Sequence, residues 1–447
     1  MIKELIKFVV VSGWYLVLPP LLGWFIRGRR SRQRWLMAGL VFLTSVPINR
    51  FTLMLDSIET YRGHTKGFEA SLIVTGALAL VWAAGLERAK GFRLFPPGAG
   101  WWWLYCGISA ISFFAAPNQT YVLMAVWKFT TFGLIMVGAY NYLRDEEDLR
   151  WLLRALAVTL IVQALVVLKL KYVDGFYQVR GWFEHQNPLS MWAYMIGLPL
   201  LATAMSKASV RDGRLWGAGF VCAAIIVQSA LSRASLAIFA VGVIGVIVAG
   251  FIDGVTSRRI RFVMGLALVG MLGLAATADT IIARFGDRGN QASGETRDVM
   301  NLASAAMLQD SAVGIGWNNF GLTINQPFHY GDVINDWERA RGHKVDEDYA
   351  KGIVESHYWL LLAETGYGGL ITYLLFIFIV QWWCLRGAWA NRGRLAGPFM
   401  GAVAIAFALT YLHSDLERVL TQTKNISMWM ILIGVVARLE MQRKGKA

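Results

Sequence analysis

The chain has 447 residues, of which 56% are hydrophobic and only 16% charged, and its mean hydropathy is +0.47. Soluble proteins carry roughly a quarter charged residues. Here the apolar residues recur in long blocks, which excludes an ordinary soluble enzyme and predicts a polytopic membrane protein. The net charge of +14 would suggest nucleic acid in a soluble chain. The basic residues instead cluster in short segments between apolar blocks, as the positive-inside rule produces, so we expect no nucleic-acid partner.

The apolar blocks predict an all-α protein, because a backbone in lipid must satisfy its own hydrogen bonds. No stretch alternates with the period of a barrel strand. Some blocks are short, so we expect twelve or thirteen transmembrane helices. We interpret the first block as a retained span rather than a removed signal peptide. The blocks lie near residues 5–26, 35–49, 68–86, 99–116, 121–143, 152–172, 188–205, 216–231, 235–252, 262–278, 358–382, 396–412 and 425–438.

The distribution of Lys and Arg predicts the orientation. Basic clusters follow every second block, for example at 27–34, 88–93, 144–154, 207–214 and 386–394. We assign this side to the cytoplasm. The C-terminus then faces the cytoplasm; the N-terminus faces out with thirteen spans and in with twelve. The opposite side carries a long polar loop, 279–357, and loops of this length are usually functional. We treat residues 1–447 as one membrane-embedded domain containing this loop.

The stretch "YQVRGWFEHQNPLSMW" (177–192) supplies candidates at one membrane boundary on the loop side. Arg180 precedes Gly181, and a glycine lets the backbone approach a ligand closely. An ordinary polar loop before the next span is the alternative. For His185 and Asn187 we favour roles as helix-capping and hydrogen-bonding residues.

Two further arginines lie on the same side. Arg233, in "SRAS", sits between two apolar blocks in a predicted loop of a few residues. An ionisable group at that depth is expensive and tends to be functional, although it can also extend to the lipid headgroups. Arg297 follows Glu295, so an ion pair is at least as good an explanation as ligand binding.

The stretch "VESHYWLLLAETGYGGL" (354–370) places His357 at the start of an apolar helix. A neutral imidazole there is a competent general base; a capping role is the alternative. Glu364 lies about two turns deeper, roughly 10 Å away along the helix, which is too far to hold the ring. We expect Glu364 to accept hydrogen bonds from a neighbouring helix or an arginine, and the glycines after it to allow close packing.

Other patterns carry less information. The first loop on this side holds Arg50, Asp56 and Glu59, which we interpret as a solvated charged set. Three cysteines without close spacing predict neither a disulfide framework nor a metal site. No phosphate-binding glycine loop, metal-binding helix motif or serine nucleophile elbow is present in the sequence.

Four stretches resemble motifs of the O-antigen ligase and polymerase superfamily of bacterial envelope glycosyltransferases. They occur in the same order along the chain as in that family and lie on the same side of the membrane. They are "RGWFEHQNPLSMW", "SRAS", "ETRDVMNLASAAMLQDSAVGIGWNNF" and "SHYWLLLAETGYGGLI", and together they span about 175–385. A glycine often follows the arginine of the short link in this family, and Ala234 stands there in this chain.

The resemblance implies a class C glycosyltransferase-like fold in the bacterial inner membrane, with the active site facing the periplasm. It implies an undecaprenyl diphosphate-linked glycan as donor, an inverting reaction and no metal or other cofactor. Arg180 and Arg233, with Arg297 as a third, would bind the diphosphate, and His357 would deprotonate the acceptor hydroxyl. The acceptor would be lipid A core in a ligase, another lipid-linked glycan in a polymerase, or a protein. A transporter of lipid-linked sugars remains the alternative from another class.

Overall fold

The computed structural model describes residues 2–47, 52–55, 58, 60–207, 211–252, 254–286, 289–342, 345, 351–443 and 445. The charged set Arg50, Asp56 and Glu59 lies outside these described residues. The main helices are α1 (Ile2–Ile26), α2 (Arg30–Leu43), α3 (Leu72–Leu86), α4 (Ala99–Ala110), α5 (Gln119–Tyr142), α6 (Glu146–Leu168), α7 (Gln186–Met205), α8 (Gly213–Ala230), α9 (Arg233–Ile252), α10 (Ser257–Gly286), α11 (Gly289–Asp310), α12 (Phe320–Thr323), α13 (Asp332–Ala340), α14 (His357–Ala390), α15 (Ala396–Leu416) and α16 (Thr423–Arg443). Short 3-10 turns lie at Ile111–Phe114 and His329–Gly331, and a π-helical turn at Lys169–Val173.

One hairpin departs from the all-α prediction. Strands β1 (Thr52–Leu55) and β2 (Phe68–Ser71) pair antiparallel, with Thr52 opposite Ser71. The predicted helix from residue 68 therefore begins four residues later, because these residues pair with the other end of the same loop. Ser71 then caps α3, since its hydroxyl accepts a hydrogen bond from the Ile73 amide at 3.2 Å.

The prediction of a helical polytopic membrane protein is confirmed, since each predicted apolar block falls on a helix. Seven of the described helices are long and apolar enough to cross a membrane, namely α5, α6, α7, α8, α9, α14 and α15. Two shorter apolar segments lie at Gly13–Ile26 and Leu72–Leu86. Seven is fewer than the twelve or thirteen predicted, because helices such as α2 and α16 are short or carry charge within the apolar stretch.

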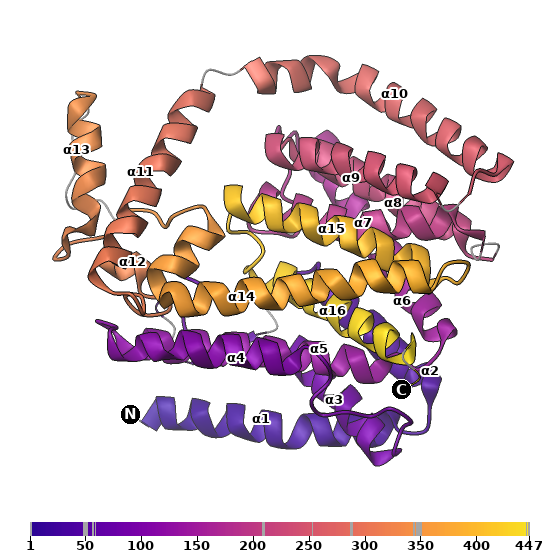
Figure 1. Ribbon diagram of the computed structural model, residues 1–447, viewed down its shortest axis with the longest axis horizontal. Coiled ribbons are helices and arrows are strands. Elements are labelled where there is room, and N and C mark those ends of the chain that lie inside the picture. The colour runs from indigo at the N-terminus through magenta and orange to yellow at the C-terminus, as the bar shows by residue number, and fades with distance from the viewer. Residues whose placement is uncertain are drawn as a thin grey trace.

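Successive helices reverse direction, so their connections gather at two opposite ends of the bundle (Figure 1). The connections α1–α2, α3–α4, α5–α6, α7–α8 and α14–α15 lie with the C-terminus at one end, which we call the basic end because it contains the arginine clusters. The other end, the cavity end, holds the starts of α5, α7 and α14 and the helices α11–α13.

Basic residues at the basic end also hold helix ends together. The buried Asp148 carboxylate, in the first turn of α6, accepts a hydrogen bond from Arg34 Nε at 2.9 Å and pairs with Arg30. The Arg438 guanidinium donates to three carbonyls of the α3–α4 and α5–α6 connections at 2.7–2.9 Å. These contacts satisfy carbonyls that helix ends leave without a partner.

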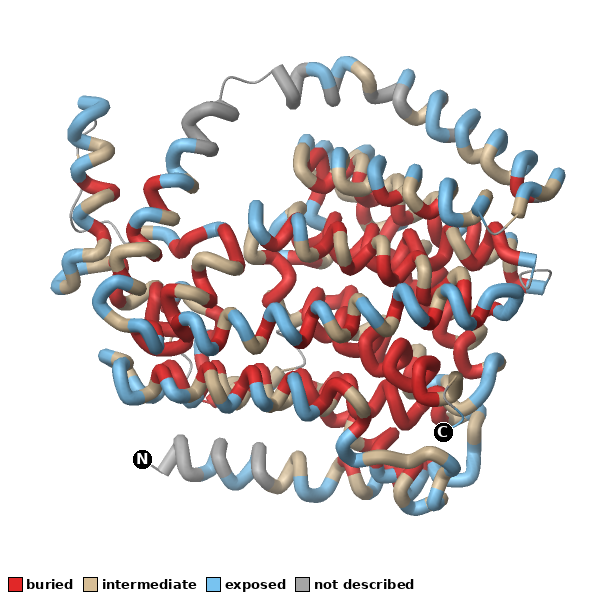
Figure 2. The backbone as a smooth tube through the Cα atoms, in the orientation of Figure 1, coloured by how far each residue is buried: buried red, intermediate tan, exposed pale blue. Residues whose placement is uncertain are grey.

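The core of the bundle lies around α7 and α16, which are buried almost throughout (Figure 2). Helix α7 packs against α8, α9 and α15, and α16 packs against α5. Helix α9 instead leaves nearly all of its apolar side chains exposed or half-buried, and α10 extends along the outside of the bundle. The apolar surface of such outer helices suits contact with lipid.

Helix α14 is broken at Gly366, whose φ of +65° and ψ of −167° suit only glycine. The residues before α12 fill the break: the Ile315 amide donates to the Ala363 carbonyl at 2.9 Å, and the Tyr367 amide donates to the Ala312 carbonyl at 3.3 Å. A Cβ at position 366 would collide with the backbone of this loop. Gly366 thus interrupts the helix so that the loop can dock into it.

We expect Gly366→Ala to lower the free energy of unfolding by roughly 2 kcal/mol or more, because it adds backbone strain and a backbone clash. Thermal unfolding of the purified protein in detergent would measure this loss. Gly107→Ala is the matched control, since a Cβ at that position on α4 meets no atom within 4 Å. Equal unfolding temperatures for the two variants would contradict this account of the break.

Candidate functional site

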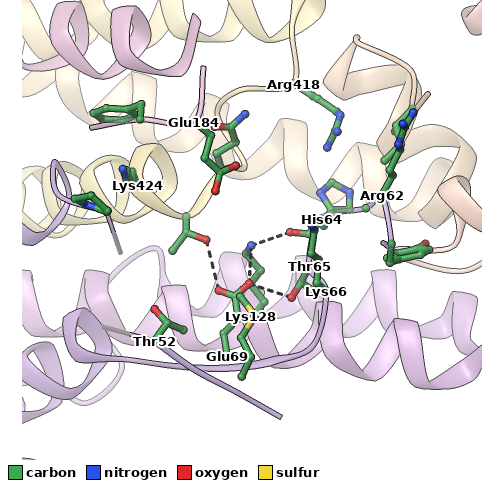
Figure 3. Close-up of a pocket in the computed structure, with 18 of the residues that line it drawn as sticks. Thr52, Arg62, His64, Thr65, Lys66, Glu69, Lys128, Glu184, Arg418 and Lys424 are labelled. Atoms are coloured by element: carbon green, nitrogen blue, oxygen red, sulfur yellow. Dashed lines mark hydrogen bonds and ion pairs between the residues drawn. The ribbon is translucent and has the colours of Figure 1, made fainter. Parts of the chain in front are cut away.

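A cavity of about 840 Å³ opens at the cavity end of the bundle (Figure 3). Its walls come from the loop around residues 60–66, from segment 180–184 before α7, and from residues 418–424, which include the end of the α15–α16 loop and the start of α16. Lys128 on α5 and Glu69 on β2 contribute the floor. Residues from distant parts of the sequence therefore meet in one polar chamber.

The cavity is strongly cationic. Among the described residues that line it, six are Lys or Arg and two are Glu. Cations gathered in a concave site raise the local concentration of anions. The cations are Arg62, Lys66, Lys128, Arg180, Arg418 and Lys424, and the carboxylates are Glu69 and Glu184.

The positive charge of Lys128 is neutralised by a carboxylate of the protein itself. Its ammonium group lies 3.1 Å from the Glu69 carboxylate and donates to the His64 carbonyl at 2.7 Å (Figure 3). Thr65 donates to the same carboxylate at 3.0 Å. A buried pair with this many hydrogen bonds is a fixed structural element, so Lys128 and Glu69 shape the floor rather than supply net charge.

Arg180 and Gly181 both line the cavity. The Arg180 guanidinium is exposed and makes one long hydrogen bond, to the Glu184 carbonyl at 3.4 Å. Gly181 has a φ of +54°, and a Cβ there would collide with Gln163 of α6. The glycine therefore allows close approach to α6, which holds the neighbouring Arg180 at the cavity wall.

Arg418 is a cavity residue that the sequence analysis did not single out. It follows the end of α15 and is half-buried, and its guanidinium makes no hydrogen bond or ion pair with any residue that the structure describes. Burial lowers the pKa of this guanidinium, while the negative charges of Glu364 and Glu355 oppose the shift. An arginine stays protonated under such conditions, so a desolvated positive charge faces the cavity.

Lys424 stands on the opposite side of the cavity from Arg418 in Figure 3. Its ammonium group lies 4.4 Å from the centre of the Phe183 ring and donates to the Trp182 carbonyl. These contacts join the start of α16 to the segment that carries Arg180. The cavity thus has cations on two facing walls, Arg418 on one and Arg180 with Lys424 on the other.

His357 is the first residue of α14, and its ring is fully buried behind the cavity rather than on its wall. Its ring nitrogens have no hydrogen-bond partner among the described residues. The ring packs edge-on against Tyr373, with the ring centroids 5.1 Å apart, and lies close enough to Arg418 for that positive charge to act on it. The imidazole is therefore adjacent to the cationic wall but shielded from it.

The turn before His357 is fixed by hydrogen bonds. The Ser356 hydroxyl accepts from the Trp359 amide at 3.4 Å, which caps α14, and donates to the Asp415 carboxylate at 2.9 Å. Tyr358 donates to the Tyr411 carbonyl at 2.8 Å. Ser356, not His357, is the capping residue, which removes the simplest structural explanation for the histidine.

Glu364 joins three segments at the cavity end. Its carboxylate accepts hydrogen bonds from the amides of Asn318 at 2.9 Å and Phe320 at 3.0 Å. Its Oε2 also lies 3.0 Å from His64 Nε2, at ion-pair distance but without the alignment of a hydrogen bond. Phe320 is the first residue of α12, so one of the hydrogen bonds comes from a neighbouring helix as expected, whereas the ionisable partner is a histidine and not an arginine. Asn318 in turn accepts from the His64 amide at 2.7 Å.

The structure does not bring Arg233 and Arg297 onto the cavity wall. Arg233 lies in the first turn of α9 rather than in a loop, because only two residues separate it from the end of α8. Its Nη1 is buried without a partner among the described residues. Arg297, on α11, pairs with Glu355 and lies 3.9 Å from Glu417. The expected ion pair of Arg297 thus exists, but its partner is not Glu295, which pairs with Arg341.

His185 and Asn187 organise the neighbouring helix ends. His185 caps α7, since its Nδ1 accepts from the Asn187 amide at 3.4 Å. The Asn187 side chain lies beside the Glu417 carboxylate. Burial raises the pKa of Glu417 to about 7, with Arg297 opposing that shift. His413 lies 3.8 Å from the same carboxylate. These residues connect α7, α11 and α15 outside the cavity.

Among the described residues, no group of three His, Cys, Asp or Glu side chains is placed to hold a metal ion. The cavity chemistry instead consists of cations on facing walls beside a buried imidazole. No protein-family model and no curated protein matches the sequence of this chain.

We expect Glu364→Ala to lower the free energy of unfolding by about 3 kcal/mol, because two buried amides and His64 lose their partner. Unfolding of the detergent-solubilised protein would measure it. Glu355→Ala is the control, since Glu355 is half exposed and forms a surface pair worth at most about 1 kcal/mol. A loss at Glu364 no larger than that of the control would contradict the role assigned to this carboxylate.

We expect Arg418→Gln to weaken the binding of inorganic pyrophosphate about tenfold, because a charge-assisted hydrogen bond contributes about 1.5–3 kcal/mol. Titration of the full chain in nanodiscs would give the dissociation constant. Arg341→Gln is the control, since that exposed arginine lies at the end of α13 and does not line the cavity. An unchanged constant in Arg418→Gln would show that the cavity does not bind diphosphate through this residue.

Proposed function

We propose that the chain is an O-antigen ligase-type glycosyltransferase of the bacterial inner membrane. It would transfer a glycan from undecaprenyl diphosphate to a hydroxyl of lipid A core oligosaccharide on the periplasmic face. The observation that supports this most is the cationic cavity, with Arg180 and Arg418 on facing walls at the end opposite the arginine clusters. By the positive-inside rule the cluster-bearing end is cytoplasmic, so the cavity opens to the periplasm.

The facing arginines suit a diphosphate. A guanidinium presents two N–H groups to one phosphate oxygen pair, and such charge-assisted bonds strengthen as negative charge develops on a leaving group. Arg180 and Arg418 take this role in the proposal. The end of α8 supports the segment that carries Arg180, because the Ser229 carbonyl accepts from the Val179 amide at 3.4 Å. Arg233, in the first turn of α9, does not line the cavity and takes no part in the proposed step. Arg297 is committed to Glu355 and has no role toward the donor.

A lipid path also favours a polyprenyl donor. An apolar groove of about 510 Å³ lies between α14 and α15 and includes Phe378 and Tyr411. The Tyr411 carbonyl accepts from Tyr358, the residue after His357. A hydrocarbon chain in this groove would therefore end close to the proposed reaction centre.

In the proposed step, the acceptor hydroxyl oxygen attacks the anomeric carbon while the bond from that carbon to the diphosphate breaks. The lipid diphosphate leaves with the bonding electrons, and the hydroxyl proton passes to His357. Because the imidazole is fully buried, the reaction requires a shift of residues 351–356. Gly352 and Ile353 in this segment line the cavity, and its last residue precedes the histidine.

Release of undecaprenyl diphosphate by the purified protein, given a lipid-linked glycan and rough lipopolysaccharide, would test the function. Product formed with lipopolysaccharide supports ligation. Product formed only when a second lipid-linked glycan is the acceptor would identify a polymerase. Movement of intact donor across a vesicle membrane without release would identify a transporter and overturn the proposal.

We expect His357→Ala to reduce transfer by at least about a hundredfold, the usual contribution of a general base, while expression and membrane insertion persist. Initial rates of undecaprenyl diphosphate release would measure the effect. His329→Ala is the control, because that histidine is exposed on the 3-10 turn near α13. Near-normal turnover in His357→Ala would remove the assignment of the base.

A further inference from the structure

A second cavity of about 440 Å³ lies beside the cationic cavity, under α11 and α13. We call it the lateral cavity. Gly352 and Ile353 line both cavities, so the segment that leads to His357 forms the wall between them. A ligand held in the lateral cavity would therefore stand next to anything bound in the first one.

The lining of the lateral cavity differs in character from that of the first. It contains two cations, Arg297 and Lys351, and two carboxylates, Glu338 and Glu355, so its formal charge is balanced. Met300 and Ile334 supply an apolar part of the lining. Balanced donors and acceptors suit a hydroxyl-rich ligand, whereas a phosphate would prefer the first cavity.

Two of these four charged side chains, Glu338 and Lys351, are available to bind a ligand. Within the part of the chain that the structure describes, the side chains of Glu338 and Lys351 make no hydrogen bond and no ion pair. Arg297 and Glu355, by contrast, pair with each other. The ammonium group and the carboxylate line the same cavity but do not pair with each other. A ligand can therefore accept a hydrogen bond from the ammonium group and donate one to the carboxylate.

The lateral cavity also lies on the side of the molecule that suits a water-soluble ligand. Helices α11 and α13 project from the cavity end of the bundle, away from the basic end (Figure 1). The α13 residues around the lining position Glu338 are exposed or half-buried. The apolar groove for a lipid chain lies instead between α14 and α15, so lipid and glycan can approach from different directions.

We propose that the lateral cavity binds the acceptor glycan, with Glu338 and Lys351 holding its sugar hydroxyls. The role of this glycan as an acceptor rests on the proposed transferase function, whereas the binding of an oligosaccharide in this cavity does not depend on it. The shared wall at Gly352 and Ile353 then brings an acceptor hydroxyl to the boundary of the donor cavity. The lateral cavity has balanced charge and favours the uncharged glycan, whereas the cationic cavity favours the anionic donor. The two cavities therefore select different substrates.

The test uses the full chain in nanodiscs and deacylated core oligosaccharide as the probe. We expect the double variant Glu338→Gln, Lys351→Met to raise its dissociation constant about tenfold, because charge-assisted hydrogen bonds to sugar hydroxyls are lost. The dissociation constant for inorganic pyrophosphate stays unchanged. Asp336→Asn is the matched control, since this carboxylate lies on the same helix but outside the cavity, paired with Arg339 at 3.0 Å.

Equal oligosaccharide affinity in the double variant and the wild type would overturn the proposal, as would a wild type that does not bind the probe. If the variant loses oligosaccharide binding but the wild type never releases undecaprenyl diphosphate, the glycan site stands and the transferase function fails. If the wild type does release it and the variant binds normally, the function stands and the lateral site fails. Unfolding temperature of the double variant controls for loss of structure.

Discussion

The buried carboxylate of Glu364 is the contact on which the cavity end depends. It accepts from the amide of Asn318 in the loop before α12 and from that of Phe320 at the start of α12, and it faces His64 from the first loop of that end. Through Asn318 the same junction fixes residues 61–65, which form one wall of the cationic cavity. A carboxylate can accept several hydrogen bonds at once and is costly to leave unpaired, so the junction ties the wall, the loop and α14 into one unit.

Electrostatics sorts the many basic residues into two kinds. At the basic end Arg34 and Arg438 are satisfied by carboxylates and backbone carbonyls, so their charge stabilises helix ends. In the cavity Lys128 is likewise satisfied, whereas Arg418 and Arg180 have few or no partners. Desolvated positive charge without a partner is unfavourable for folding alone. Of the two, only Arg418 is desolvated as well as unpartnered, and this fits the proposed anionic ligand better than a role in folding.

Much of the helical architecture could be predicted, because long apolar blocks leave a chain in lipid little choice but helix. The sequence also suggested that Arg180 lies near a ligand site, because a glycine follows it at a predicted membrane boundary. Arg418 and His64 were missed because their importance arises from segments that meet only in the folded chain. One signal was available for Arg418: like Arg233, it lies in a short segment between two apolar blocks. The partner of Arg297 and the break at Gly366 depend on the docking of a distant loop, which residue spacing does not encode.

The interruption at Gly366 divides α14 into unequal parts. Residues 367–390 rise about 36 Å, which is enough on its own to cross the roughly 30 Å hydrocarbon layer. The short upper part, 357–365, then stands in the headgroup region, at the border between two solvents. An amphiphile bound there could keep its hydrocarbon chain in the bilayer and its sugars in water throughout the proposed reaction. Neither part would then have to be transferred into an unfavourable solvent.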